Sequence, residues 1–147
     1  MCAAVNLKYE FIQLDIYKFE QKKAPYNILN PLYQVPIMDE DDFILYESHA
    51  IAGYVARRQG KHSEFFGDSP ESMALVEQYL HAHHATIRNS TEELVRKNYF
   101  ALLYAPSQLK ADTDRQEKEC FKAWQWVDQQ LEKKRFLSGD TATFADM

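Results

Sequence analysis

The sequence of 147 residues contains few of the residue types that build turn-rich or disulfide-stabilised proteins. It has only four glycines and five prolines, which argues against a β-sandwich, because many short strands need frequent turns. Its two cysteines, Cys2 and Cys120, are too few for a disulfide framework and suit a reducing compartment. We therefore expect a cytoplasmic protein rich in helices.

Positive charge and long apolar runs are also scarce. The formal net charge is −5 and no basic stripe is visible, so we expect no nucleic-acid partner. No apolar run approaches the ~18 residues of a membrane-spanning helix, so we expect no membrane partner either. The hydrophobic content of 46% is enough for a substantial core.

The periodicity divides the chain into an α/β region, residues 1–60, and a helical region, residues 69–147. The interval from Gly60 to Asp68 breaks the periodicity and is predicted to be a linker. In the first region, Tyr9–Asp15 alternates like a strand, and Ala24–Leu29 is predicted to be a short helix or turn. Two further short strands and a helix from Ser48 to about Gln59 complete it.

The second region begins with a helix whose N-cap is Ser69, followed by Pro70. Thr113 is predicted to begin a later helix. The apolar residues at helical spacing are expected to be buried, namely Met73, Val76, Leu80, His83 or His84 and Ile87 in the earlier helix, and Cys120, Trp124, Val127 and Leu131 in the later one.

The most informative segment is a strand interrupted by Val35-Pro36, an acidic turn at Asp39–Asp42, a second strand, and a helix that begins at Glu47-Ser48. Proline gives no N–H to a β-ladder. A bend there, which a cis Val35–Pro36 bond would produce, would leave the Val35 N–H and C=O free to pair with an extended peptide. The amides at a helix N-terminus, with the Ser48 hydroxyl, suit a carboxylate, and Glu47 suits an ammonium group. An edge strand followed by an ordinary N-cap is the alternative.

This segment resembles the glutathione-binding half of cytosolic glutathione transferases, which carry Asn-Pro-x-Gly-x-Val-Pro and Glu-Ser-x-Ala-Ile signatures. Here they read Asn30 to Pro36 and Glu47 to Ile51. The resemblance continues to Phe136–Asp146, where Thr143 and Asp146 match the family's capping box, and Val76–Arg88 is most similar to the first long helix of the theta class. It implies a thioredoxin-like N-terminal domain followed by an all-helical C-terminal domain.

The resemblance also implies the site residues. Val35 and Pro36 would hold the cysteinyl part of glutathione, and Glu47 and Ser48 its γ-glutamyl end. Gln34 matches a residue near the glycyl carboxylate. Gln21 and Lys22 match a His-Lys pair of the phi and theta classes, and Arg88 matches an Arg that faces the substrate. Solvated surface charge is the alternative reading of Lys22 and Arg88.

Three positions depart from the family pattern. Tyr33 stands in place of a glycine or another small or basic residue, Gln21 in place of His, and Ala85 in place of an acidic residue. The first departure could alter the turn before Val35-Pro36, and the second weakens a charged contact. Together they leave the substrate class open.

The resemblance implies that the family's first strand and its thiol-activating Ser, Tyr or Cys lie before Met1, and that the helix capped by Thr143 continues past Met147. We therefore interpret the chain as a piece of a longer protein, with no catalytic residue of its own and no activity alone. Strand Tyr9–Asp15 would then lack a ladder partner, and strand Val35–Met38 would have an open edge.

The activity that the resemblance implies is conjugation of the glutathione thiolate to an apolar electrophile in the cleft between the domains. Family members are usually homodimers, and Tyr46–Tyr54 with the helix Met73–Arg88 would face the partner. Two alternatives stay open: a non-catalytic binding or scaffold domain, and a glutathione-dependent reductase or isomerase, which would need a Cys in the preceding turn.

Other groupings of reactive residues predict less. His81, His83 and His84 have no third ligand at a fixed spacing, so a helix surface or interface is favoured and no metal site is predicted. In the register of the family, Cys2 lies at the wrong end of its helix for a reactive cysteine, so we expect an inert thiol. The carboxylates of Asp39–Asp42 are better explained by a turn than by a calcium site.

Overall fold

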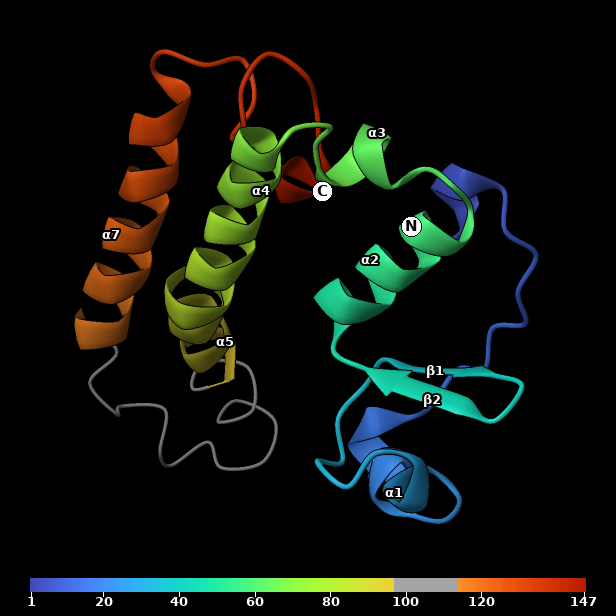
Figure 1. Ribbon diagram of the computed structural model, residues 1–147. Helices are drawn as coiled ribbons and strands as arrows, with labels where there is room; N and C mark the ends of the chain where they lie inside the picture. The colour runs from blue at the N-terminus through green and yellow to red at the C-terminus, as the bar shows by residue number, and fades with distance from the viewer. Residues whose placement is uncertain (97–113) are drawn as a thin grey trace. The chain divides into compact units, whose positions relative to one another are not determined.

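The computed structural model describes residues 1–96 and 114–147 (Figure 1), which form two compact units, residues 1–63 and 64–147. Element labels follow Figure 1. The first unit contains short 3-10 turns, a two-stranded sheet and one longer helix. The second is helical.

The elements of the first unit are η1 (Ala3–Val5), η2 (Ile16–Lys18), η3 (Glu20–Lys22), α1 (Tyr26–Leu29), β1 (Ile37–Glu40), β2 (Phe43–Tyr46) and α2 (Ser48–Arg58). From Ala24 to Gln59 they follow the predicted order, although β1 begins at Ile37, two residues later than the strand Val35–Met38 that the sequence predicted. The predicted short helix within Ala24–Leu29 and the helix from Ser48 are confirmed. Both have local signals, a proline before the first and a Ser at the start of the second.

Strands β1 and β2 form an antiparallel hairpin in which Ile37 pairs with Tyr46 and Glu40 with Phe43. The loop therefore has only two residues, Asp41 and Asp42, with φ angles of 49° and 69°. Two positive φ angles are the requirement of a type I′ hairpin turn, and Asp tolerates this conformation better than most residues. The acidic turn predicted at Asp39–Asp42 is thus shorter, because Asp39 and Glu40 belong to β1.

Helix α2 packs against β2 through small side chains. Ala52, Gly53, Val55 and Ala56 are buried, whereas the larger Ile51 and Tyr54 are only half-buried. The Tyr54 ring instead contacts Phe43, at 5.1 Å between centroids, and its hydroxyl donates to Glu40 Oε2 at 2.6 Å. This hydrogen bond to a carboxylate, together with desolvation, raises the pKa of Tyr54. A polar contact thereby helps to hold α2 on the hairpin.

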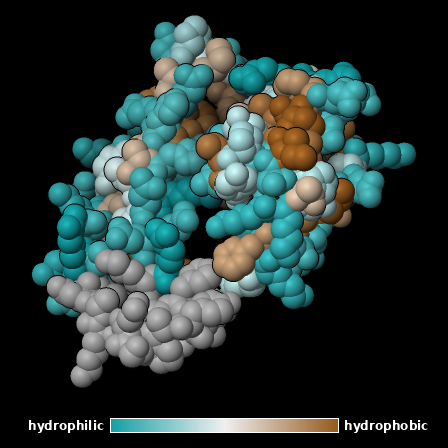
Figure 2. Space-filling view, turned by 90° about the horizontal axis from the view of Figure 1, so that it is seen from below, coloured by the Kyte–Doolittle hydropathy of each residue, from teal (hydrophilic) through white to brown (hydrophobic). Residues whose placement is uncertain are grey.

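The segment Tyr9–Asp15, predicted to be a strand, forms no strand in the structure. Its backbone has no ladder partner among the described residues, and Tyr9, Phe11 and Ile12 are exposed. Alternating side chains alone do not make a strand, because the ladder needs hydrogen bonds from a neighbour. They are among the large hydrophobic side chains that are exposed, and Figure 2 shows hydrophobic residues, in brown, on the face that it presents.

The second unit contains α4 (Pro70–Ala82), η4 (His83–Arg88), α5 (Asn89–Val95), α7 (Asp114–Leu131) and η7 (Phe144–Asp146), and α3 (His62–Phe66) lies at the boundary of the two units. The interval predicted to be a linker therefore contains a helix. The Ser69 cap is confirmed, since its Oγ accepts from the Ser72 N–H. Thr113 lies outside the described residues. None of the described helices has the length and apolar character needed to cross a bilayer.

One cluster of the core of this unit is formed by Ile87, Ala123 and Val127, with the rings of Tyr79 and Trp126 and the Leu137 side chain packed around them. The stripe predicted on α7 is therefore partly wrong. Val127 is buried, but Trp124 and Leu131 are 51% and 40% exposed, and Gln116 and Ala123 are buried instead. Apolar periodicity predicted the helix but not the direction of its contacts, because α7 carries more apolar residues than one face can bury.

The capping box at the end of the described chain is confirmed. The Thr143 hydroxyl accepts from the Ala145 N–H at 3.3 Å, and Asp146 Oδ2 accepts from the Thr143 N–H at 2.9 Å. Asp146 Oδ1 also accepts from the Leu137 N–H at 2.8 Å. One carboxylate therefore holds both the start of η7 and the preceding loop.

Candidate functional site

The loop between α1 and β1 is organised by one buried side chain, Asn30, which is 1% exposed. Its Oδ1 accepts from the Leu32 N–H at 3.0 Å, and its Nδ2 donates to the Gln34 carbonyl at 2.9 Å. Its own carbonyl accepts from the Tyr33 N–H at 3.0 Å. A single asparagine therefore determines the path of the chain up to the residue before Val35.

Tyr33 lies in the left-handed region of this loop, with φ of 59°. A side chain with a Cβ adopts that region at a cost, whereas glycine does so freely. This explains why the signature motif has glycine here. The departure noted in the sequence is thus accommodated in the turn, which Asn30 holds in place.

The Val35–Pro36 peptide bond is cis, one of the ways in which the sequence could produce a bend at this point. The cis bond at Ala24–Pro25 was not considered in the sequence. Val35 is 41% exposed. Its N–H and C=O take part in none of the hydrogen bonds found among the described residues. Val35, two residues before the start of β1, therefore offers both a hydrogen-bond donor and an acceptor to an extended ligand.

The register of the hairpin brings Glu47 and Ser48 to the same end. Because Ile37 pairs with Tyr46, Val35 and Ser48 both lie two residues beyond this last pair. Glu47 is exposed, with φ of 73°, a conformation that for a non-glycine residue is uncommon and often found at functional sites.

Helix α2 begins directly after Glu47, so its N-terminus lies at this end of the hairpin. The first hydrogen bond of the helix runs from the Ile51 N–H to the Glu47 carbonyl, and the amides of the first turn have no acceptor inside the helix. The Glu47 side chain does not cap this helix end. These amides, the positive end of the helix dipole and the half-buried Ser48 form an environment that favours a carboxylate.

Gln21 and Lys22 lie on η3, which packs against α1. Among the described residues, the buried Gln21 Oε1 has no hydrogen-bond donor, and the Lys22 ammonium lies 5.1 Å from the centre of the Phe19 ring. Gln34 is exposed, and its backbone carbonyl is held by Asn30. Of the predicted glutathione-binding residues, the hairpin register brings Val35, Pro36, Glu47 and Ser48 to one end of the hairpin.

Arg88 lies on η4, in the second unit. Its Nε is 3.8 Å from Glu92 Oε2, one helical turn further on, and its side chain is 44% exposed. This pairing favours the surface-charge reading of Arg88 over a role in the site. Asn30, which holds the loop before Val35, was part of the signature in the sequence but was given no role there, although an Asn-Pro pair shortly before Val-Pro is a recognisable signal for a turn.

Comparison with known proteins connects this geometry to a family. Residues 1–57 match the family model "Glutathione S-transferase, N-terminal domain". Glutathione S-transferase hmp2 of the fungus Hypomyces subiculosus is 32% identical over 152 residues, covering 97% of this chain and 68% of the relative. The chain belongs to the glutathione S-transferase family.

Solved structures of the family agree with the fold. Apo human glutathione S-transferase T1-1 superposes with a TM-score of 0.83 and 26% identity, over 99% of this chain and 62% of that one. A delta-class transferase of Nilaparvata lugens gives 0.82 and 27%, over 99% and 65%. The fold is therefore the thioredoxin-like N-terminal domain with a short sheet plus the helical C-terminal domain. The chain spans about two thirds of the length of these relatives.

Proposed function

We propose that the end of the β1–β2 hairpin binds glutathione, and that the protein uses it as the co-substrate of a transferase. The observation that carries this proposal is that the Val35 backbone, unpaired among the described residues, lies at the same hairpin end as the N-terminus of α2. The relatives are named glutathione S-transferases, which favours a transferase over the scaffold and reductase hypotheses.

Each part of the tripeptide has a complementary group. The Val35 N–H and C=O would pair with the cysteinyl backbone as an added strand does. The first-turn amides of α2 and the Ser48 hydroxyl would donate to the γ-glutamyl carboxylate, and the Glu47 carboxylate would pair with its ammonium. Gln34, Lys22 and Gln21 are the proposed contacts near the glycyl end, with Pro36 fixing the geometry of Val35.

The reaction would be nucleophilic attack by the bound thiolate on an apolar electrophile. The sulfur lone pair forms the new carbon–sulfur bond, and the leaving group departs with the electron pair of the bond that breaks. The binding groups named above hold both ends of the peptide, so that its sulfur is fixed while the electrophile approaches. Theta-like specificity, a homodimer and a cytoplasmic location belong to this proposal.

Isothermal titration of the 147-residue chain with two dipeptides tests the assignment. γ-Glutamylcysteine keeps the groups that Glu47 and Ser48 would bind, whereas cysteinylglycine lacks them. Ser48→Ala should weaken γ-glutamylcysteine and glutathione about tenfold, because it removes a hydrogen bond to a charged group worth about 1.5 kcal/mol. Cysteinylglycine should bind both forms equally. An equal effect on both dipeptides, or no uptake of glutathione by the unsubstituted chain, would contradict the proposal.

A further inference from the structure

Tyr54 connects two parts of the first unit that each supply half of the proposed glutathione site. Val35 and Pro36 precede β1 of the hairpin, whereas Ser48 is the first residue of α2. Glu47 alone joins β2 to α2, with φ of 73°, and α2 turns back over the hairpin from there (Figure 1). The direction of α2 therefore decides how its first turn faces Val35.

The apolar contacts of α2 define this direction poorly. The helix packs against β2, and its buried side chains are those of Ala52, Val55 and Ala56. These side chains are short, and apolar contact has no preferred direction, so a small rotation of α2 about Glu47 would retain most of the burial. A directional contact is needed to select one orientation.

A hydrogen bond supplies that contact near the other end of the hairpin. The Tyr54 hydroxyl donates to Glu40 Oε2 at 2.6 Å, and Glu40 precedes the two-residue turn. Glu40 Oε1 lies 3.7 Å from Arg58 Nε, one helical turn after Tyr54. The Arg58 contact is long and its side chain is 62% exposed, so it contributes less. Because a hydrogen bond is directional, the Tyr54 hydroxyl fixes α2 at the end of the hairpin opposite to Glu47.

We propose that Tyr54 is a positioning residue for the γ-glutamyl end of glutathione, an inference that rests on the proposed function of the hairpin end. By holding α2 on Glu40, the hydroxyl keeps Ser48 and the first-turn amides directed at the γ-glutamyl carboxylate while Val35 holds the cysteinyl part. Tyr54 itself does not contact the ligand. Both partners of the hydrogen bond belong to one chain, so the contact does not depend on the second subunit of the proposed homodimer.

Isothermal titration of the 147-residue Tyr54→Phe chain with two dipeptides tests this role. The substitution removes the hydroxyl and keeps the ring that contacts Phe43, at 5.1 Å between centroids. γ-Glutamylcysteine spans Ser48 and Val35, and it should bind about threefold to tenfold more weakly, the upper value being the loss of one hydrogen bond to a charged group. Cysteinylglycine lacks the γ-glutamyl group and should bind with unchanged affinity.

Variants of Glu40 separate this hydrogen bond from a general loss of stability. Glu40→Ala removes the acceptor and should reproduce the effect of Tyr54→Phe. Glu40→Gln keeps an amide oxygen that can accept from the Tyr54 hydroxyl, so it should retain most of the affinity for γ-glutamylcysteine. Tyr54→Phe combined with Glu40→Ala should weaken binding little further than either substitution alone, because both remove the same hydrogen bond.

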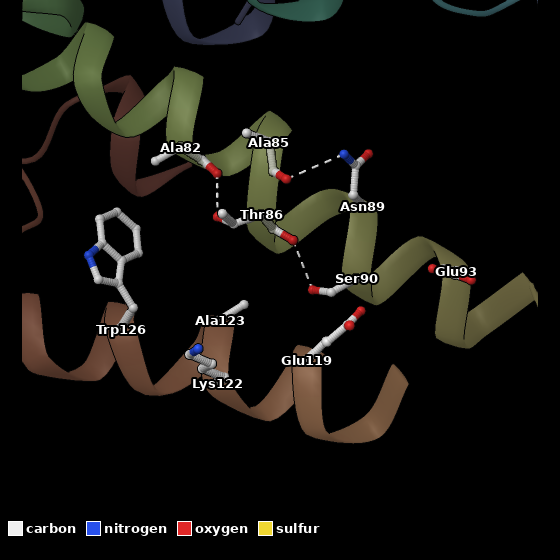
Figure 3. A pocket seen from close by; sticks show the side chains of 10 residues that line it. All are labelled: Ala82, Ala85, Thr86, Asn89, Ser90, Glu93, Glu119, Lys122, Ala123 and Trp126. Atoms are coloured by element: carbon white, nitrogen blue, oxygen red, sulfur yellow. Dashed lines mark hydrogen bonds between the residues drawn. The ribbon is translucent and has the colours of Figure 1, made fainter. Parts of the chain in front are cut away.

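Ser90→Ala is the matched control, because it also deletes one hydroxyl group. Ser90 lines a pocket of the second unit, where its hydroxyl donates to the Thr86 carbonyl at 2.9 Å (Figure 3). It lies outside the first unit. The affinities for both dipeptides should therefore equal those of the unsubstituted chain.

Equal weakening of both dipeptides by Tyr54→Phe would overturn the positioning role, as would unchanged binding of γ-glutamylcysteine. Binding by Glu40→Gln as weak as that by Glu40→Ala, or a similar loss in Ser90→Ala, would overturn it too. All these results leave the proposed function intact, because the unsubstituted chain still binds glutathione. Failure of the unsubstituted chain to bind glutathione would overturn both proposals.

Discussion

Replacement of Asn30 by alanine should loosen the first unit while the second stays intact. The substitution removes the hydrogen bonds from the Leu32 N–H and to the Gln34 carbonyl, each worth about 1 kcal/mol. Leu32 and Gln34 are exposed, so water can replace the lost partners, and the penalty for unsatisfied groups stays small. The expected loss is therefore about 2 kcal/mol in the free energy of opening.

Hydrogen exchange measured by mass spectrometry separates the two units, which bulk denaturation does not. A loss of about 2 kcal/mol raises exchange in peptides from β1, β2 and α2 roughly thirtyfold, with α7 peptides unchanged. Asn30→Asp should be at least as damaging despite its equal size, because a carboxylate oxygen replaces the amide donor facing the Gln34 carbonyl, 2.9 Å away.

Function should follow the same loop. At a temperature where the Asn30→Ala chain is still folded, its affinity for glutathione should fall about tenfold, because the Gln34 carbonyl precedes Val35 and loses its anchor. Asn89→Ala is the matched control, since Asn89 is exposed and makes one longer bond in the second unit. Unchanged exchange in β1 and β2, or an equal effect of Asn89→Ala there, would refute this reasoning.

Three further predictions concern single positions. Tyr33→Gly should raise the stability of the first unit by about 1 kcal/mol in urea denaturation followed by hydrogen exchange, because φ is 59°. Gly67→Ala should lower the melting temperature far more than Gly139→Ala, since both have positive φ but only at Gly67 would a Cβ lie 2.7 Å from the Met73 amide nitrogen. Burial, with the charges of His84 and Arg88 adding to it, lowers the pKa of His83. The free energy of unfolding of the second unit should therefore have its full value above about pH 6.5 and fall as the pH drops through that value. His83→Gln should flatten this dependence.

Each of these has a contrary result. Destabilisation by Tyr33→Gly would show that the exposed ring contributes more than the backbone costs. Equal melting temperatures for the two alanine variants would mean that the Gly67 turn rearranges freely. A melting temperature of the second unit that rises as the pH is lowered from neutral to acidic, or an unchanged profile in His83→Gln, would contradict the direction given for the His83 pKa.

The features that the sequence predicted well are those decided by neighbouring residues. Ser69 before Pro70 marked the start of α4, and Thr143 with Asp146 gave a capping box, because a cap joins groups only two or three residues apart. The bend at Val35-Pro36 and the helix from Ser48 were likewise local. Four of the proposed glutathione contacts, Val35, Pro36, Glu47 and Ser48, lie at one end of the hairpin for this reason: the two-residue turn fixes the register in which Ile37 pairs with Tyr46.

Tertiary structure alone decided the rest. Tyr9–Asp15 has the pattern of a strand but no ladder among the described residues, because strand formation depends on hydrogen bonds from a distant segment. Helix α7 could have buried Trp124 and instead buries Ala123 and Val127, since its partner helix, not its own periodicity, selects the face.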